Sequence, residues 1–237
     1  MPSPASPLGA NRLLRAIPQN DLDRLSPRLE RQQTGLKDVL FQPNMPIEGV
    51  YFPLSGVVSI ITVVDNDRGI ELATVGREGM VGVPLFLGAR YTSTHEISQV
   101  HIPGELIHMS LDTFNEESRP GGPLYDIVRR YTQAFISQIS RHVACNRLHS
   151  VEQRFSRWLL WTHDRVSGDD FPMTHEFLSQ MLGVRRHSVT AAAGRLQSAG
   201  VIRYRRGRMS IVDRDGLEGT CCECYRIIRK EFDRLIG

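Results

Sequence analysis

Residues 174–200 read THEFLSQMLGVRRHSVTAAAGRLQSAG, and this stretch decides the fold of the C-terminal part of the chain. The Thr174 hydroxyl can cap the first turn of a helix, and Glu176 follows where an acidic side chain suits the positive end of the helix dipole. Gly183 ends that helix, because glycine readily adopts the positive φ of a tight turn. A second helix then runs as far as Gly200. The pattern predicts a helix-turn-helix.

The start of the second helix, from Val184 onward, is rich in hydrogen-bond donors. In a helix-turn-helix this end of the second helix lies in the DNA major groove and contacts base edges. An arginine there can bond guanine O6 and N7 together, which is worth about 1–3 kcal/mol of discrimination. We therefore expect base contacts from Arg185, Arg186, His187, Ser188 and Thr190.

Residues 201–212, VIRYRRGRMSIV, predict two short strands joined at Arg206-Gly207. A basic hairpin directly after a helix-turn-helix is a wing, and its target is the DNA phosphate backbone. Standing alone, the same hairpin would be interpreted as a solvated charged surface. The expected phosphate contacts are Arg203, Arg205, Arg206 and Arg208.

Charge divides unevenly along the chain. Residues 1–140 hold 12 basic and 15 acidic side chains, whereas residues 141–237 hold 17 basic and 11 acidic ones. A basic C-terminal part suits a polyanionic partner. Composition alone does not distinguish nucleic acid from an acidic membrane surface.

The N-terminal part has a different texture. One or two short helices are expected within residues 11–29, and β-rich runs separated by Pro, Gly, Asn and Asp follow as far as residue 109. Short strands at this spacing predict a sandwich or barrel. The runs are residues 39–41, 50–52, 57–64, 70–75, 96–102 and 105–109, and a short helix is expected over 111–117.

A long helix is predicted from Leu124 to about Asn146, with two apolar edges. One edge recurs at alternating steps of four and three, the spacing of a coiled-coil seam. We expect this edge to pair with a second subunit and the other to pack on the chain's own barrel. The expected dimer contacts are Leu124, Val128, Tyr131, Phe135, Gln138 and His142, and the second edge is Ile127, Ile136, Ile139 and Val143. The alternative is one buried helix in a monomer.

The 237-residue chain is 41% hydrophobic, enough for one large or two modest domains. No apolar run approaches the roughly 20 residues of a membrane span, and no membrane partner is expected. Residues 1–10 lack the pattern of a secretory signal, and we expect a disordered tail on a cytoplasmic protein. Cys145, Cys221, Cys222 and Cys224 do not have the spacing of a disulfide framework, which fits a reducing compartment.

The sequence resembles the Crp/Fnr family of transcription regulators along nearly its whole length. The resemblance rests on the order of the predicted elements and on residues 50–58 (VYFPLSGVV), 76–82 (GREGMVG) and 178–183 (LSQMLG). It implies an α+β fold with an N-terminal β jelly-roll barrel, a long dimerisation helix and a C-terminal winged helix-turn-helix. The expected domains are a disordered tail over 1–10, a cyclic-nucleotide-binding-like sensor over 11–120, the dimerisation helix over 121–147 and the DNA-binding domain over 148–237.

The resemblance also indicates what is missing. Cyclic-AMP binders of the family place a Glu after the glycine that matches Gly82, and an Arg near the end of the same segment. Here Val83 replaces the Glu, and the Arg position falls on Thr92 or Ser93. Burying a phosphate without its cation is costly, so we expect no cyclic-AMP binding of the usual kind. The expected effector-binding residues are Gly82, Val83, Thr92, Ser93 and Thr94.

The reading helix departs from the family too. Arg186 matches the family's first arginine, but His187 replaces a Glu and Ala191 replaces a later Arg. The resemblance therefore implies DNA binding without implying the family's usual target sequence.

Iron–sulfur, haem and cysteine-based sensing each require residues that can be sought in the sequence. An iron–sulfur centre of this family needs N-terminal cysteines, which the chain lacks. A haem could use Pro2, His95, His101 or His108, but isolated histidines in strands are more often surface or hydrogen-bonded core groups. A structural role, as small buried residues that anchor a helix, is the preferred interpretation of Cys221, Cys222 and Cys224. A redox or metal site is the alternative, but metal sites usually pair cysteines two residues apart. No metal site is expected, and the cofactor stays unknown.

The sequence thus predicts a dimeric, sequence-specific DNA-binding transcription regulator controlled by a signal other than cyclic AMP, with RNA polymerase as a further partner. No phosphate-binding glycine loop, metalloprotease helix or nucleophile elbow is present in the sequence, and no enzyme is expected. The alternatives are a ligand-binding or protein-interaction module without DNA binding, and a haem- or redox-responsive regulator.

Overall fold

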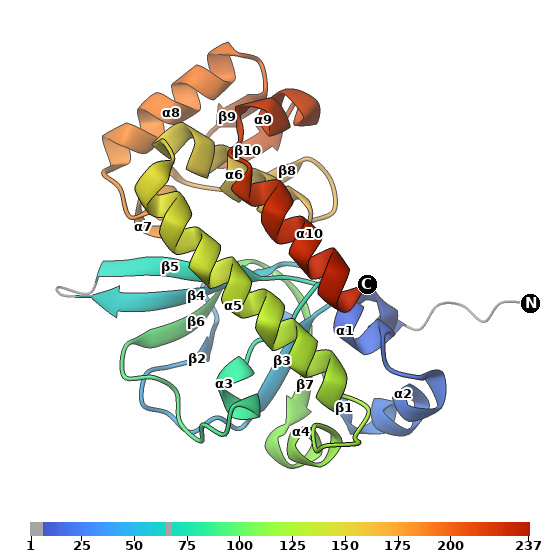
Figure 1. Ribbon diagram of the computed structural model, residues 1–237. Coiled ribbons are helices and arrows are strands. Elements are labelled where there is room, and N and C mark those ends of the chain that lie inside the picture. The colour runs from blue at the N-terminus through green and yellow to red at the C-terminus, as the bar shows by residue number, and fades with distance from the viewer. Residues whose placement is uncertain (1–6, 65–67) are drawn as a thin grey trace, which may run out of the picture.

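The computed structural model describes residues 7–64 and 68–237. A β domain lies at one end, the long helix α5 (Tyr125–Leu148) runs past it, and the remaining C-terminal elements form a second domain at the far end of α5 (Figure 1). Among the described residues, no helix combines the length and the apolar character that a membrane crossing needs.

Short helices begin the described chain: η1 (Pro7–Ala10), α1 (Arg12–Arg15), α2 (Gln19–Leu25) and η2 (Ser26–Arg28). Asn11 caps α1 by accepting from the backbone N–H groups of Leu13 and Leu14. Its amide also donates to Pro53 O and Gly79 O, which ties α1 to the β domain. The disordered tail expected over residues 1–10 is therefore corrected at its end, because η1 is helical and buries Leu8. Residues 1–6 of that tail lie outside the described part.

The β domain contains two antiparallel sheets that share one hydrophobic core. The first has the order β1-β7-β3 and the second β2-β6-β4-β5. The strands are β1 (Leu29–Thr34), β2 (Val39–Phe41), β3 (Gly49–Pro53), β4 (Val57–Val64), β5 (Arg68–Val75), β6 (Glu96–Ile102) and β7 (Gly104–Ser110), followed by α4 (Leu111–Glu117). The predicted α+β class is confirmed, with an open pair of sheets in place of a closed barrel.

Helix α5 corrects the predicted dimer seam. Leu124, Val128, Tyr131, Gln138 and His142 are buried within the chain, and only Phe135 is half-buried. The polar members bond to the β domain: the Tyr131 hydroxyl donates to Met80 O, the Gln138 amide to Thr74 O, and His142 Nδ1 lies 2.9 Å from Leu72 O. On the other edge, Ile136 is 48% and Val143 68% exposed, whereas Ile139 is half-buried and Ile127 is buried. The predicted seam therefore packs on the chain's own β domain, and the sequence did not indicate this because the backbone partners come from strands and loops far away in the sequence.

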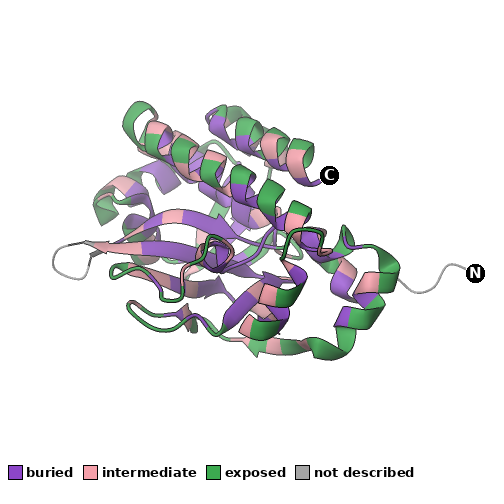
Figure 2. Ribbon diagram, turned by 60° about the horizontal axis from the view of Figure 1, so that its bottom comes forward, coloured by how far each residue is buried: buried purple, intermediate pink, exposed green. Residues whose placement is uncertain are grey.

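The C-terminal domain follows α5 directly. It contains α6 (Val151–His163), β8 (Asp170–Pro172), α7 (His175–Leu182), α8 (Arg186–Ser198), β9 (Ile202–Arg205), β10 (Arg208–Ile211), α9 (Arg214–Thr220) and α10 (Cys224–Ile236). Ser150 and Gln153 form a capping box that starts α6. Helix α10 returns along α5, with its apolar side buried and its opposite side exposed (Figure 2). Phe232 lies between the Tyr131 and Trp161 rings, at centroid distances of 6.2 and 5.9 Å.

A buried polar cluster joins the two domains. Glu71 of β5 accepts from the Ser59 hydroxyl at 2.6 Å and from the Trp158 indole of α6 at 2.9 Å. Arg165, just after α6, forms an ion pair with Glu78 at 2.6 Å, and both side chains are buried. The two domains are therefore packed on one another over a specific set of polar contacts.

Candidate nucleic-acid interface and effector pocket

The helix pair forms where the sequence predicts it. The Thr174 hydroxyl accepts from the Phe177 N–H at 3.1 Å and so caps α7. Gly183 has φ 63° and ψ 38°, the left-handed conformation that the turn needs. Helix α8 begins at Arg186, two residues later than predicted, because Val184 and Arg185 are extended or in the turn, and Arg185 is its N-cap.

Helix α8 has one buried side and one free side. Its buried residues are Val189, Ala192, Ala193 and Leu196. Arg185, Arg186, His187 and Thr190 are exposed at its N-terminal end, and Ser188 is half-buried. The nearest carboxylate to Arg186 is Glu176 at 3.9 Å, a loose contact between two exposed side chains. The predicted base-contacting residues thus share the free end of one helix.

The predicted wing forms as well. Strands β9 and β10 pair antiparallel across a two-residue turn, where Arg206 has φ 49° and Gly207 φ 76°. Positive φ at both central positions is the hairpin geometry that matches strand twist. A non-glycine residue there costs about 1 kcal/mol. Arg203, Arg205, Arg206 and Arg208 are all exposed, and within residues 7–64 and 68–237 none of them forms an ion pair.

His175 connects the wing to α8. Its ring stacks on Tyr204 of β9 at 4.2 Å, and its Nδ1 lies 3.1 Å from the Thr190 hydroxyl of α8. Burial, with a smaller effect of Arg186, lowers the pKa of His175, so the ring is neutral near pH 7. The wing strand and the N-terminal half of α8 therefore lie side by side, and their positive charge comes from arginines.

The expected effector residues divide into two groups. Gly82 and Val83 line a cavity of about 370 Å³ between the β domain and α5. Thr92 is buried elsewhere, where its hydroxyl bonds to Gln42 O and accepts from the Met45 N–H at 3.0 Å. Ser93 and Thr94 are exposed. The expectation that Thr92, Ser93 and Thr94 line the pocket is therefore corrected. Thr92 instead bonds to the neighbouring loop at Gln42 and Met45.

The cavity is apolar. Met80, Leu72 and Ile60 line it on one side, and Phe135, Ile136 and Ile139 of α5 line it on the other. Glu96 and Ser98 are its polar side chains, and no lysine or arginine is among the described lining residues. Burial raises the pKa of Glu96. A volume of this size suits a small organic ligand, and of the α5 residues in the wall only Ile136 is exposed, while Phe135 and Ile139 are half-buried.

The histidines considered for haem do not converge. His101 is buried, with its Nδ1 2.6 Å from the Ser59 hydroxyl, and burial followed by the Arg165 charge lowers its pKa to about 3. His108 lies against Tyr51 and 3.6 Å from Glu30, and His95 is exposed.

One cluster was missed by the sequence reasoning. Cys145 and His149, at the end of α5, meet Cys222 and Cys224, at the start of α10. The two pairs are far apart in the sequence, but a cysteine and a histidine four residues apart on a helix share one face. That spacing is the signal that could have pointed to Cys145 and His149.

Comparisons with known proteins agree with this geometry. Residues 153–220 match the Crp-like helix-turn-helix domain family. A sequence comparison with curated proteins finds no match.

Several solved structures share the fold. A Crp/Fnr-family regulator from Eubacterium rectale has a TM-score of 0.68 at 17% identity, over 90% of this chain and 98% of that one. FixK2 from Bradyrhizobium japonicum has a TM-score of 0.65 at 12% identity, over 82% and 98%. CLP from Xanthomonas campestris, described as responsive to c-di-GMP, has a TM-score of 0.57 at 20% identity, over 82% and 99%.

At these identities the solved structures establish the fold, while the domain family establishes the helix-turn-helix. The exposed N-terminal end of α8 and the arginine-rich wing are consistent with this fold and with the helix-turn-helix family. The chain is a DNA-binding transcription regulator with a Crp-like helix-turn-helix domain on the fold of the Crp/Fnr family.

Proposed function

We propose that this regulator binds DNA as a homodimer, with α8 in the major groove and the wing on the phosphate backbone. The observation that carries the proposal is the His175 bridge, which sets the free end of α8 beside the wing. Arg185, Arg186, His187, Ser188 and Thr190 face bases, and Arg203, Arg205, Arg206 and Arg208 face phosphates. We also propose that it acts in the cytoplasm, where the chromosome lies, and engages RNA polymerase there.

The dimer is proposed to form through the free edge of α5. This edge consists of five exposed residues separated by alternating steps of three and four: Gln133, Ile136, Ser140, Val143 and Arg147. Such spacing suits helix-on-helix pairing. A two-fold dimer would present its reading helices about one DNA turn apart, roughly 34 Å.

Paired arginine variants test the two kinds of DNA contact. Arg186→Ala removes a base contact, so binding should lose preference at one position of the site, by about 1–3 kcal/mol. Arg206→Ala removes a phosphate contact, so binding should weaken on all sequences and the slope of log affinity against log salt should fall by about one. Electrophoretic mobility shifts with randomised sites at several salt concentrations measure both effects.

Arg15→Ala is the matched control, because Arg15 is an exposed arginine on α1 in the other domain. Its affinity and salt slope should equal those of the unchanged protein. A change of sequence preference in Arg206→Ala would mean that the wing reads bases. Failure of the unchanged protein to bind any genomic fragment would favour the ligand-binding or protein-interaction module instead.

The cavity between the β domain and α5 is proposed as the effector site, for a small apolar ligand. A cyclic nucleotide would bring a phosphate to a wall formed by Gly82, Val83 and apolar side chains, with Glu96 nearby and no described cation in the lining. A ligand seated there would contact Phe135, Ile136 and Ile139, and it would change DNA affinity only by binding one arrangement of α5 better than another.

Calorimetry tests the effector proposal. Cyclic AMP at micromolar concentration should give no heat of binding. An environment-sensitive apolar dye should bind to the unchanged protein. Its binding should be lost in Val83→Glu, because this change places a second carboxyl in the cavity wall. Leu36→Glu, an exposed position outside the cavity, is the control. Tight cyclic-AMP binding would contradict the proposal.

A further inference from the structure

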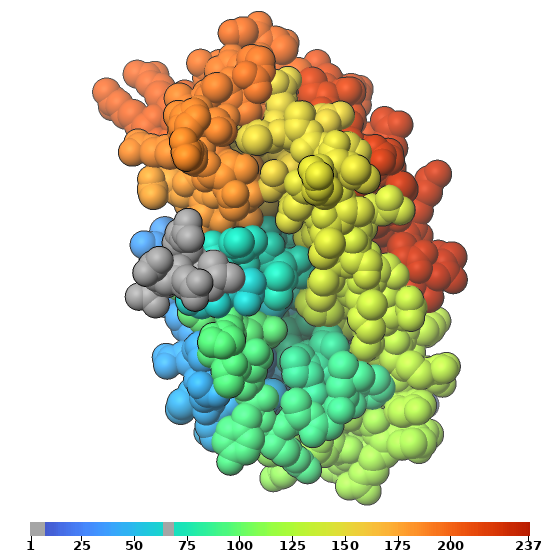
Figure 3. Space-filling model, turned by 60° about the vertical axis from the view of Figure 1, so that its left-hand side comes forward, coloured from blue at the N-terminus to red at the C-terminus, as the bar shows by residue number. Residues whose placement is uncertain are grey.

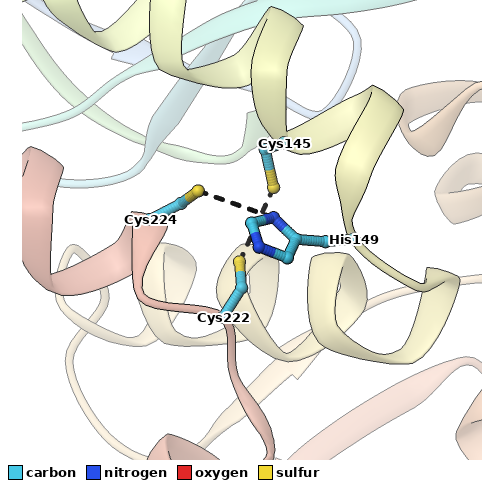
Figure 4. Close-up of side chains that lie close together, drawn as sticks. All are labelled: Cys145, His149, Cys222 and Cys224. Carbon is cyan, nitrogen blue, oxygen red and sulfur yellow. Dashed lines mark hydrogen bonds between the residues drawn. The ribbon is translucent and has the colours of Figure 1, made fainter.

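The cluster at the junction of α5 and α10 has the composition of a metal site. Three thiols and one imidazole each direct one atom inward, and these four atoms all lie within 4.8 Å of one another (Figure 4). Cys145 Sγ and Cys222 Sγ are 3.6 Å apart, and Cys224 Sγ is 3.7 Å from His149 Nδ1. Cys145, Cys222 and Cys224 are buried, and the His149 side chain is 15% exposed.

These distances match tetrahedral zinc. With Zn–S bonds of about 2.3 Å and Zn–N bonds of about 2.0 Å, two sulfur ligands in a tetrahedron are about 3.8 Å apart, and a sulfur and a nitrogen ligand are about 3.5 Å apart. The Cys145–Cys222 distance of 3.6 Å and the Cys224–His149 distance of 3.7 Å are each within about 0.2 Å of these values. A small inward movement of the remaining pairs would close the set, and Cys3His is a common structural zinc ligand set.

The surroundings of the cluster fit a metal as well. His149 contacts Cys224 Sγ through Nδ1, and its other ring nitrogen, Nε2, lies 3.2 Å from Glu223 Oε2. Histidines that bind zinc commonly donate their second ring N–H to a carboxylate, which fixes the tautomer and orientation. Cys221, the neighbouring thiol, is outside the set and only half-buried, and its Sγ contacts Cys222 O.

Charge near the cluster is also complementary. Three thiolates around Zn²⁺ leave one net negative charge, and buried anionic centres need a nearby cation. Arg154 and Arg157 of α6 are 7% and 4% exposed, and their Nε atoms have no hydrogen-bond partner among the described residues. Both are on the first two turns of α6, which starts directly after His149 and Ser150.

We propose that Cys145, His149, Cys222 and Cys224 bind one Zn²⁺ ion per chain. Binding would displace the three thiol protons to solvent, with no change of oxidation state. The site would clamp the end of α5 to the start of α10, at the point where the chain enters the DNA-binding domain. Zinc would thereby fix how that domain is set on α5.

Metal binding to the full-length protein, without DNA, tests the proposal. Protein prepared with zinc and passed over a desalting column should retain close to one zinc per chain by elemental mass spectrometry. Titration of the metal-free, reduced protein with Co²⁺ should give thiolate-to-cobalt charge-transfer bands and the intense visible bands of tetrahedral cobalt. Neither readout depends on the DNA-binding proposal, so the two can fail separately.

Cysteine variants provide a matched comparison. Cys222→Ser and Cys224→Ser should lose stoichiometric zinc and the cobalt spectrum, whereas Cys221→Ser, one residue away, should keep both. Because a core serine can also disturb folding, Glu223→Gln serves as a second variant on an exposed side chain. It should bind zinc about 10–100-fold more weakly, with an unchanged circular dichroism spectrum.

Three results would overturn the proposal. Absence of the cobalt bands would leave the cluster as neutral buried thiols. Equal zinc retention in Cys222→Ser and Cys221→Ser would place any bound metal elsewhere. A Cys145–Cys222 disulfide, detected by peptide mass mapping of protein purified without reductant and in the presence of zinc, would make the cluster a redox pair.

Discussion

At the scale of single residues, Glu71 shows how the domain contact depends on protonation. Burial raises its pKa to about 7, while bonds from Ser59 and Trp158 and the charges of Arg157 and Arg165 act in the opposite direction. The Ser59 hydroxyl that donates to Glu71 also lies 2.6 Å from His101 Nδ1, and the His101 ring packs against Trp158 of α6 and Phe177 of α7. Sequence alone could not indicate this group, because its partners come from both domains.

Glu71→Gln should remove one component of the pH dependence of stability. The fold raises the pKa of this carboxyl from 4.5 to about 7. The folded state therefore holds an extra proton in that interval, and stability from this group falls as the pH rises through it. Relative to Glu71→Gln, the unchanged protein should lose up to about 3 kcal/mol between pH values of about 5 and about 8.

Urea unfolding of both proteins at each pH measures this difference. The neutral, buried His101 and His142 add the opposite dependence below their usual pKa, but they are common to both proteins and cancel. Parallel stability curves for the two proteins would show that Glu71 is already ionised at the lower pH.

At the scale of elements, the sequence predicted more about type than about partners. The Thr174 cap, the Gly183 turn and the Arg206-Gly207 hairpin are local, and each forms as predicted. Strand β1 was missed because its sequence, LERQQT, is mostly polar and its residues are only partly buried or exposed. The seam predicted on helix α5 packs on the β domain instead, because both edges are apolar and only contacts distant in sequence decide which one is buried.

The free edge of α5 should control assembly. Ile136→Glu with Val143→Glu places two charges on the proposed interface, and the protein should become monomeric by light scattering coupled to gel filtration. Affinity for a two-half-site operator should then fall by at least about 100-fold, because two linked contacts become independent. Leu36→Glu, also on an exposed apolar residue, should stay dimeric. A dimer that survives the double change would place the interface on another surface.

At the scale of the whole molecule, the two domains share one continuous hydrophobic core. The C-terminal domain lies directly on the β domain, with α5 along the side of both (Figure 3). Arg165 is central to this contact, since it pairs with Glu78 and also donates to Thr74. The domain boundaries expected from the sequence therefore remain a proposal, and the parts they separate are packed on one another through one core.

Arg165→Met should destabilise the entire molecule. It leaves the buried Glu78 carboxylate without its cation, which costs about 3–5 kcal/mol. Adding Glu78→Gln removes the orphaned charge while keeping an acceptor for the Gly76 N–H, and the double variant should recover most of the loss. Thermal unfolding followed by calorimetry measures both variants, and a single transition is expected in each. An equally unstable double variant would indicate that packing around Arg165, and not its charge, is what matters.

The meeting of α1 and α10 has a consequence for how the chain is synthesised. Arg12 donates to Asp233 at 3.0 Å and to Gly237 O at 2.8 Å, so the hydrogen-bond partners of Arg12 are translated more than two hundred codons after it. Until α10 has left the ribosome, the α5 surface at Tyr131, which packs against Phe232 in the folded protein, is exposed to solvent and to chaperones. The β domain and α5 therefore reach their final packing only after helix α10 of the DNA-binding domain has been made.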